Sequence, residues 1–155
     1  MSIHFDIKFE NFRTFKNSDE VLFKAVEKAM TDIKDDIVDT SSSLAPHKTG
    51  KLEKSHIVKK TVIPLHRVSF EIAYRAFNKG FNYAWWTHEE KYNLGLGSQQ
   101  KQQQYHKKGK FSNKVFRVGR YYLDNATDGV EQNGGKYIEK EMKKSVAEYF
   151  AKGRD

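Results

Sequence analysis

Alternation of apolar and polar residues marks the strands of this chain. At its start, the apolar positions are Ile3, Phe5, Ile7 and Phe9, with polar residues between them. Successive side chains of a strand point to opposite faces, so this period of two predicts a half-buried strand. The alternation returns from Val68 to Tyr74, and residues 52–62 before it are rich in β-branched side chains. We expect an antiparallel pair joined near Pro64, because proline does not fit inside a central strand.

A helical period follows the first strand. After a capping signal at residues 17–20, apolar side chains recur three and four residues apart at Leu22, Ala25, Val26, Ala29, Met30, Ile33 and Ile37. This spacing predicts an amphipathic helix from about Ser18 to Ser41. We expect it to end in the serines 41–43, since hydroxyls compete for backbone partners and Pro46 disfavours helical geometry before it. A C-terminal amphipathic helix is also expected, with its apolar positions at Ile138, Met142, Val146, Tyr149 and Phe150.

Shorter elements complete the pattern. Tyr83 to Thr87 is predicted as a short aromatic strand, with one of its two tryptophans inward and the other outward. Val115 to Val118 predicts a further strand, and the apolar residues of 122–130 fit one face of a short helix. Together these elements indicate an α+β fold, with a long N-terminal amphipathic helix and a C-terminal helix packed on an antiparallel β-sheet. The 155 residues match the size of one core, so we expect a single domain over 1–155.

Residues 91–114 have a different composition from the rest of the chain. Gln, Gly and Lys predominate there, and few side chains are suited to a core. Ordering a residue costs roughly 1 to 2 kcal/mol, which so few apolar groups do not offset. We therefore expect a long mobile loop over residues 91–114 that becomes ordered against a partner. Its candidate assembly anchors are Tyr92, Leu94, Leu96, Tyr105 and Phe111.

Composition excludes several classes of protein. The chain has no cysteine, so a disulfide framework, a thiolate metal site and thiol catalysis are impossible. No apolar run approaches the ~20 residues that span a bilayer, and the first residues lack the apolar core of a signal peptide, so we expect no membrane association. Twenty-eight Lys and Arg against twenty Asp and Glu give a net charge of +8, which makes polyanions plausible neighbours.

No motif in the chain indicates catalysis. None of the six histidines has another three to five residues away, and Tyr92 stands where the second histidine of H-E-x-x-H would fall. The glycines near residue 95 lack the Lys-Ser/Thr of a phosphate loop, and G-x-S-x-G is absent. We expect no catalytic site, no cofactor and no metal. A metal-dependent nuclease using His88, Glu89 and His106 remains an open alternative.

One segment carries a more specific pattern. The run Leu44-Ala45-Pro46-His47-Lys48-Thr49-Gly50-Lys51-Leu52-Glu53-Lys54-Ser55 resembles the "aP-x-x-TG-x-L-x-x-S" element of small tailed-bacteriophage head-tail joining and tail-completion proteins, which include minor capsid and tail-terminator-like proteins. The motif positions are Pro46, Thr49, Gly50, Leu52 and Ser55. The likeness extends from about residue 18 to residue 150, through Tyr83-Ala84 with Glu89 and through residues 120–126. It departs from the family after residue 87, where His88-Glu89-Glu90-Lys91 replaces the usual Glu-x-Gly-Thr.

The resemblance implies a structural role in the virion, for a protein made in the cytoplasm of a host bacterium. Such a subunit forms a homo-oligomeric ring, commonly a hexamer, that contacts the phage tail tube or the head connector and surrounds passing DNA. In the motif itself, Thr49 offers a side-chain hydrogen bond, Gly50 a permissive φ, Leu52 a core anchor and Ser55 a partner for backbone groups. The alternative is a non-specific nucleic-acid-binding protein that uses a basic and aromatic surface around residues 83–86.

Overall fold

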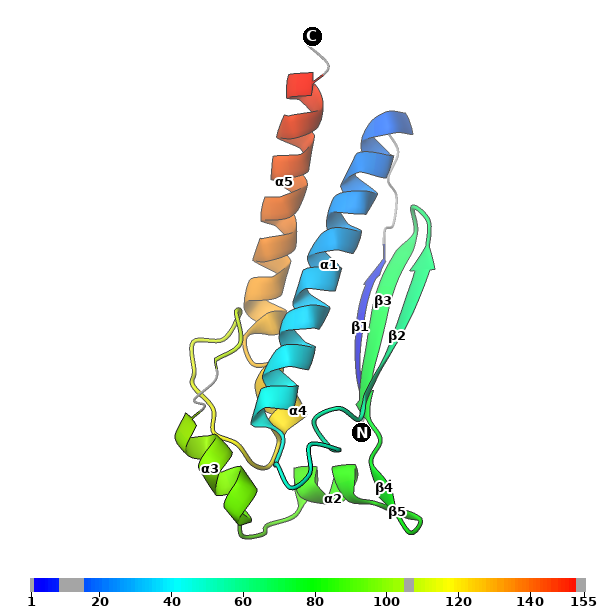
Figure 1. The fold of residues 1–155 in the computed structure, drawn as a ribbon. Helices are drawn as coiled ribbons and strands as arrows, with labels where there is room; N and C mark the ends of the chain where they lie inside the picture. The colour runs from blue at the N-terminus through cyan, green and yellow to red at the C-terminus, as the bar shows by residue number, and fades with distance from the viewer. Residues whose placement is uncertain (1, 9–15, 105–107, 153–155) are drawn as a thin grey trace.

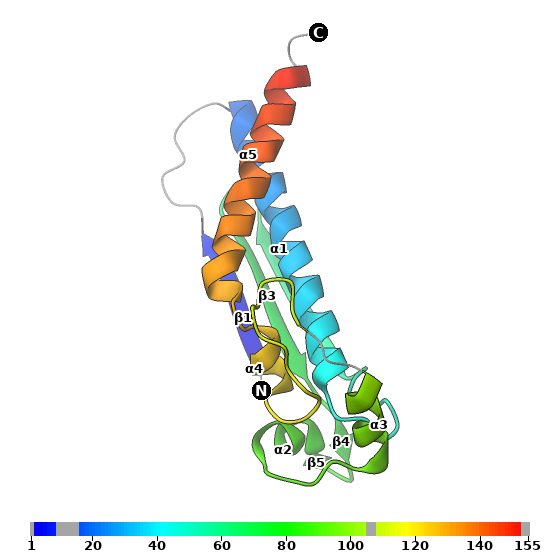
Figure 2. The same ribbon diagram turned by 90° about the vertical axis from the view of Figure 1, so that its left-hand side faces the viewer.

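Two long helices and a three-stranded sheet form the body of the protein (Figure 1). The computed structural model describes residues 2–8, 16–104 and 108–152. The body consists of β1 (Ser2–Lys8), α1 (Lys16–Leu44), β2 (His56–Ile63), β3 (Arg67–Tyr74) and α5 (Gly135–Lys152). Helix α1 lies between the sheet and α5, and the molecule is elongated along these helices (Figures 1 and 2). The expected α+β class, with both long helices, is confirmed.

The sheet is antiparallel throughout, in the order β1-β3-β2. Phe70 of the central strand stands opposite Phe5 on one side and Lys60 on the other. Alternate residues of β3 are buried in the core, namely Val68, Phe70, Ile72 and Tyr74. The first strand and the pair joined near Pro64 are therefore confirmed, while Phe9 lies outside the described residues.

Helix α1 buries most of the face that its spacing predicted, whereas Leu22 at its start is only half-buried. Ala25, Val26, Ala29, Met30, Ile33 and Ile37 are all at most 5% exposed. The helix ends at Leu44, one residue beyond the end expected at residues 41–43. The hydroxyls of Ser41 and Ser42 lie 2.7 and 2.9 Å from the Tyr74 hydroxyl, so their hydrogen-bonding capacity is used across the core. Leu44 is fully buried, and this packing extends the helix by one residue beyond Ser43.

The end of the molecule opposite the C-terminus is built from short elements (Figures 1 and 2). The strands β4 (Phe77–Asn78) and β5 (Phe81–Asn82) form a hairpin. Its two-residue connection has φ of 49° at Lys79 and 83° at Gly80, as in a type I′ turn. Helix α2 (Tyr83–Glu89) follows directly, and α3 (Leu96–Gln104) lies beside the segment that follows α1.

The aromatic strand expected at residues 83–87 is wrong, since this segment is helical. Ala84 and His88 are four residues apart and 0% and 1% exposed, so one face of α2 is buried. The Tyr122 hydroxyl donates a 3.0 Å hydrogen bond to the carbonyl of Ala84, beside this buried face. Tertiary packing on a helical period thus overrides the strand preference of the aromatic residues.

Residues 91–114 contain a helix, α3, contrary to the long mobile loop expected from the sequence. Phe111, expected as an anchor for a partner, is 6% exposed and packs against Tyr137 with ring centroids 5.4 Å apart. The strand expected at residues 115–118 is reduced to an isolated bridge at Phe116. The short helix expected next is α4 (Tyr122–Ala126), followed by a π-helical turn, η1 (Val130–Gly134).

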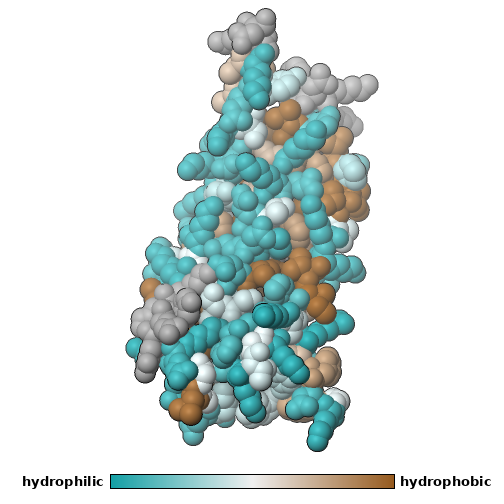
Figure 3. Space-filling view, in the orientation of Figure 1, coloured by the Kyte–Doolittle hydropathy of each residue, from teal (hydrophilic) through white to brown (hydrophobic). Residues whose placement is uncertain are grey.

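The surface is mostly polar on the face shown in Figure 3. Hydrophilic side chains cover most of α5, and apolar side chains gather on the right-hand side, over α1 and the sheet. Along α5, Ile138 and Met142 pack against the core, whereas Phe150 is 60% exposed near the end. Among the described residues, no helix combines the length and apolar character needed to cross a membrane.

Candidate functional site

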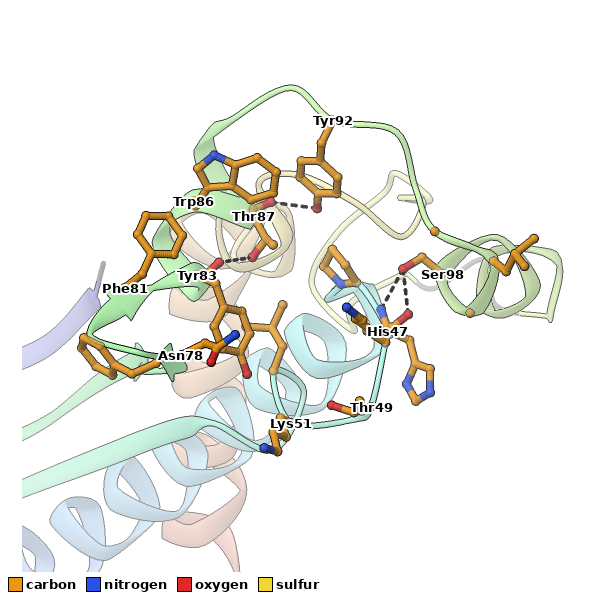
Figure 4. A pocket seen from close by; sticks show the side chains of 17 residues that line it. His47, Thr49, Lys51, Asn78, Phe81, Tyr83, Trp86, Thr87, Tyr92 and Ser98 are labelled. Atoms are coloured by element: carbon orange, nitrogen blue, oxygen red, sulfur yellow. Dashed lines mark hydrogen bonds between the residues drawn. The ribbon is translucent and has the colours of Figure 1, made fainter.

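An open cleft of about 860 Å³ lies at the end of the molecule that carries the short elements (Figure 4). Four segments line it: the turn at residues 46–52, the β4–β5 hairpin, α2 with the segment to Tyr92, and the start of α3. This volume is within the range of roughly 300 to 1,000 Å³ found for ligand-binding pockets.

The turn at residues 46–52 is held by its own backbone and by the core. Gly50 adopts φ of +74°, the left-handed conformation that a turn glycine accommodates without strain. Leu52 is 5% exposed and belongs to the main hydrophobic core. The Ser55 hydroxyl donates a 2.7 Å hydrogen bond to the Leu52 carbonyl, which closes the turn before β2. Thr49 is exposed, and its hydroxyl has no partner among the described residues, so the expected hydrogen bond is absent there.

Helix α3 is fastened to this turn by polar contacts. The buried Ser98 hydroxyl accepts a 2.9 Å hydrogen bond from the His47 amide and lies 3.1 Å from the His47 carbonyl. The Lys101 ammonium donates to the carbonyls of Ser42 and Ala45, at 3.0 and 2.7 Å, and pairs with the Glu53 carboxylate. Burial lowers the pKa of Lys101, and the hydrogen bond that its ammonium donates to the Glu53 carboxylate opposes that shift. The contacts fix α3 as one wall of the cleft.

The turn gives the cleft a positive wall. Lys48 and Lys51 are exposed and line the cleft, and neither has a carboxylate partner among the described residues. No Asp or Glu of the described part of the chain lines the cleft. The nearby carboxylate of Glu53 is held by Lys101 and lies 3.0 Å from Nδ1 of His47. The negative charge on this side is therefore engaged, whereas the charges of the two lysines are available to a ligand.

Aromatic side chains form the opposite wall. Phe77 and Phe81 of the hairpin are 61% and 53% exposed, and Trp86 is 38% exposed. The Trp86 ring stacks on Tyr92, with centroids 5.1 Å apart and an interplanar angle of 26°. The Tyr92 hydroxyl donates a 2.9 Å hydrogen bond to the Thr87 carbonyl, and burial raises the pKa of Tyr92 to about 12 (Figure 4). This wall is an exposed apolar surface next to the lysines.

The cleft brings together residues of the motif turn and residues expected from the sequence to be assembly anchors. Those that line it are Pro46, Thr49, Leu52, Tyr92 and Leu96. Gly50 and Ser55 shape the turn without lining the cleft, and Leu94 is half-buried nearby. Phe111 lies in the core, and Tyr105 is outside the described residues.

Sequence reasoning missed the hairpin and the two lysines of this site. The signal for the hairpin was present, because Asn78-Lys79-Gly80 between Phe77 and Phe81 has turn residues flanked by aromatic residues. Lys48 and Lys51 had no distinguishing signal in a chain with 28 basic residues.

No family model, curated protein or solved structure matches this chain.

The histidine region of α2 does not form a metal site in the described part of the chain. His88 is 1% exposed, its Nδ1 lies 2.8 Å from Oε1 of Glu89, and its Nε2 lies 3.7 Å from Oδ2 of Asp124. These two carboxylates face different ring nitrogens, so they do not converge on one ion. Among residues 2–8, 16–104 and 108–152, no group of three potential ligands converges. His106 of the proposed nuclease site is outside the described residues.

Proposed function

We propose that this protein is a structural subunit of a bacteriophage or prophage head-tail junction. It forms a ring that completes the tail or joins it to the head connector. The observation that carries the proposal is the convergence of the motif turn at residues 46–52 with Tyr92 and Leu96 in one cleft. Exposed aromatic side chains that line the cleft, Phe77 and Phe81, are typical of a surface that binds protein.

The open edges of the sheet support assembly into a ring. In the order β1-β3-β2, the outer sides of β1 and β2 have no strand partner among the described residues. Both strands run antiparallel to β3, so they run in the same direction. A head-to-tail contact therefore pairs β2 of one copy with β1 of the next in parallel, and repeated rotation closes a ring. A two-fold contact would instead pair β2 with β2 and stop at a dimer.

The side chains of β2 favour such a contact. Ile57, Val58 and Ile63 are 48%, 37% and 46% exposed, on an edge where natural proteins usually avoid apolar residues. Lys60 on the same strand pairs with Glu27 of α1, and Lys59 stands opposite Glu71 of β3, so this edge presents the apolar residues beside an exposed lysine. In the ring, the net charge of +8 provides weak, sequence-independent contact with passing DNA.

The test is the oligomeric state of the full chain and of an edge variant. Light scattering after size-exclusion chromatography, at several protein concentrations, should give a concentration-dependent ring that is visible by negative-stain microscopy. The double variant Ile57→Lys, Ile63→Lys should remain monomeric with an almost unchanged Tm, because both residues are exposed and edge lysines oppose strand pairing. The control is Val115→Lys, which also replaces an exposed apolar residue, 58% exposed, outside the sheet.

Two results would contradict the ring. One is a closed dimer that the β2 variant dissociates, which indicates a two-fold edge contact. The other is a monomer that binds short DNA duplexes with steep salt dependence, which supports the alternative of a non-specific nucleic-acid-binding protein. Rings that form equally well from the β2 variant would leave assembly intact but move the interface away from the sheet edge.

A further inference from the structure

We infer that the cleft binds an extended segment of a partner protein in which carboxylates flank an aliphatic or aromatic side chain. The inference rests on the proposed function, since it takes the partner to be another protein of the junction. It adds the chemistry by which that partner is recognised. Its basis is the pairing of a positive wall with an aromatic wall in one cleft (Figure 4).

The positive wall selects carboxylates. Lys48 and Lys51 extend from one turn, and among residues 2–8, 16–104 and 108–152 no acidic residue lines the cleft to compete with a ligand for them. Glu53, a carboxylate of the segment that follows this turn, is already paired with Lys101. The ammonium group of a lysine is a compact charge, so it holds an acidic side chain without the fixed geometry that a bidentate guanidinium group requires.

The aromatic wall selects an apolar side chain. Phe77, Phe81 and Trp86 offer ring surface that is 61%, 53% and 38% exposed, and removing such surface from water favours a complex through the hydrophobic effect. Tyr83, which is half-buried, also lines the cleft and provides apolar surface beyond the hairpin. An aliphatic or aromatic anchor entering here would remove water from both walls at once.

The same geometry disfavours a nucleic acid as the occupant. Trp86 and Tyr92 stack on each other, so one face of each ring is already covered and no base can enter between them. Two lysines on a single turn do not form the extended basic track that follows a phosphate backbone over several nucleotides. A protein segment needs neither feature, because one apolar anchor and adjacent carboxylates satisfy both walls.

The test uses the full chain and a random peptide library. Immobilised protein should select peptides in which Asp or Glu flank Leu, Ile, Phe or Trp, and a selected peptide should change the fluorescence of the protein's tryptophans on binding. The double variant Lys48→Glu, Lys51→Glu should weaken that peptide by about tenfold or more, because attraction becomes repulsion. The matched control, Lys140→Glu with Lys144→Glu on α5, makes the same change in net charge at exposed positions away from the cleft and should bind normally.

Selection of no peptide, selection of peptides without acidic residues, or equal weakening by both double variants would overturn the inference. So would displacement of the selected peptide by single-stranded oligothymidylate at lower concentration than by unlabelled peptide, which would assign the cleft to nucleic acid. Failure of this inference can be distinguished from failure of the proposed function. Rings without peptide selection refute the specificity of the cleft alone, and peptide binding by a protein that stays monomeric refutes the ring alone.

Discussion

The close approach of α3 to the turn at residues 46–52 makes a prediction with a definite sign. A Cβ at Gly97 would lie 2.8 Å from the carbonyl oxygen of His47, a backbone atom. Ordinary contacts begin near 3.4 Å, so Gly97→Ala forces the start of α3 away from the turn. This movement breaks the contacts between the Ser98 hydroxyl and the backbone of His47.

The magnitude follows from the buried position of Ser98, which is 4% exposed. Losing two hydrogen bonds and leaving buried polar groups without partners costs about 2 to 4 kcal/mol. Alanine is favoured over glycine inside a helix by about 1 kcal/mol, which offsets part of the loss. A net destabilisation of about 1 to 3 kcal/mol remains, or a fall in Tm of about 2 to 12 °C for a chain of this size.

Gly135→Ala is the matched control for this prediction. Gly135 begins α5 with helical backbone angles, and nothing lies within 4 Å of a Cβ added there. This variant should therefore be more stable than wild type by up to about 1 kcal/mol. Thermal denaturation measures both variants, and amide hydrogen exchange should show faster exchange across α3 in Gly97→Ala only. A rise in Tm for both variants would refute the docking of α3 on the turn.

The remaining predictions concern the core and pH. Gly129→Ala should lower Tm more than Gly80→Ala. Both glycines have positive φ, 77° and 83°, but only at Gly129 would an added Cβ lie 2.3 Å from the Phe111 carbonyl oxygen. Equal losses of Tm in the two variants would contradict this contact. The hydrogen bond to Asp32 raises the pKa of Tyr137 from 10.0 to about 12, so the stability that this tyrosine contributes below pH 10 is lost as pH rises toward 12. Tyr137→Phe should therefore lose less stability than wild type between pH 9 and about 11.5, and identical pH profiles of Tm would exclude this contribution.

Periodic segments were predictable because their signal is local. Buried residues recur every three or four positions in α1 and at every second position in β3. This spacing identifies the buried face of each element without knowledge of what packs against it. The turn at residues 46–52 was also recognisable, since Gly50 and Leu52 have conformational and packing roles that act within a few residues.

Elements that depend on distant contacts were predicted wrongly. Residues 83–87 have strand-forming side chains, yet Ala84 and His88 bury one helical face in the core. Helix α3 has almost no apolar side chains, and its placement relies on Lys101, which reaches backbone carbonyls more than fifty residues earlier in the sequence. Neither contact has a signature in the neighbouring sequence.

The sequence by itself determined the class of the fold, the long helices, the central strands and the turn at residues 46–52. Periodicity and backbone preference are properties of short segments, so they survive without knowledge of the rest of the chain. Only the tertiary structure decided that the motif turn, the hairpin with Phe77 and Phe81, and α3 meet at one end of the molecule. That meeting depends on packing and polar contacts between segments that are remote in sequence, and it places Lys48 and Lys51 opposite an aromatic wall.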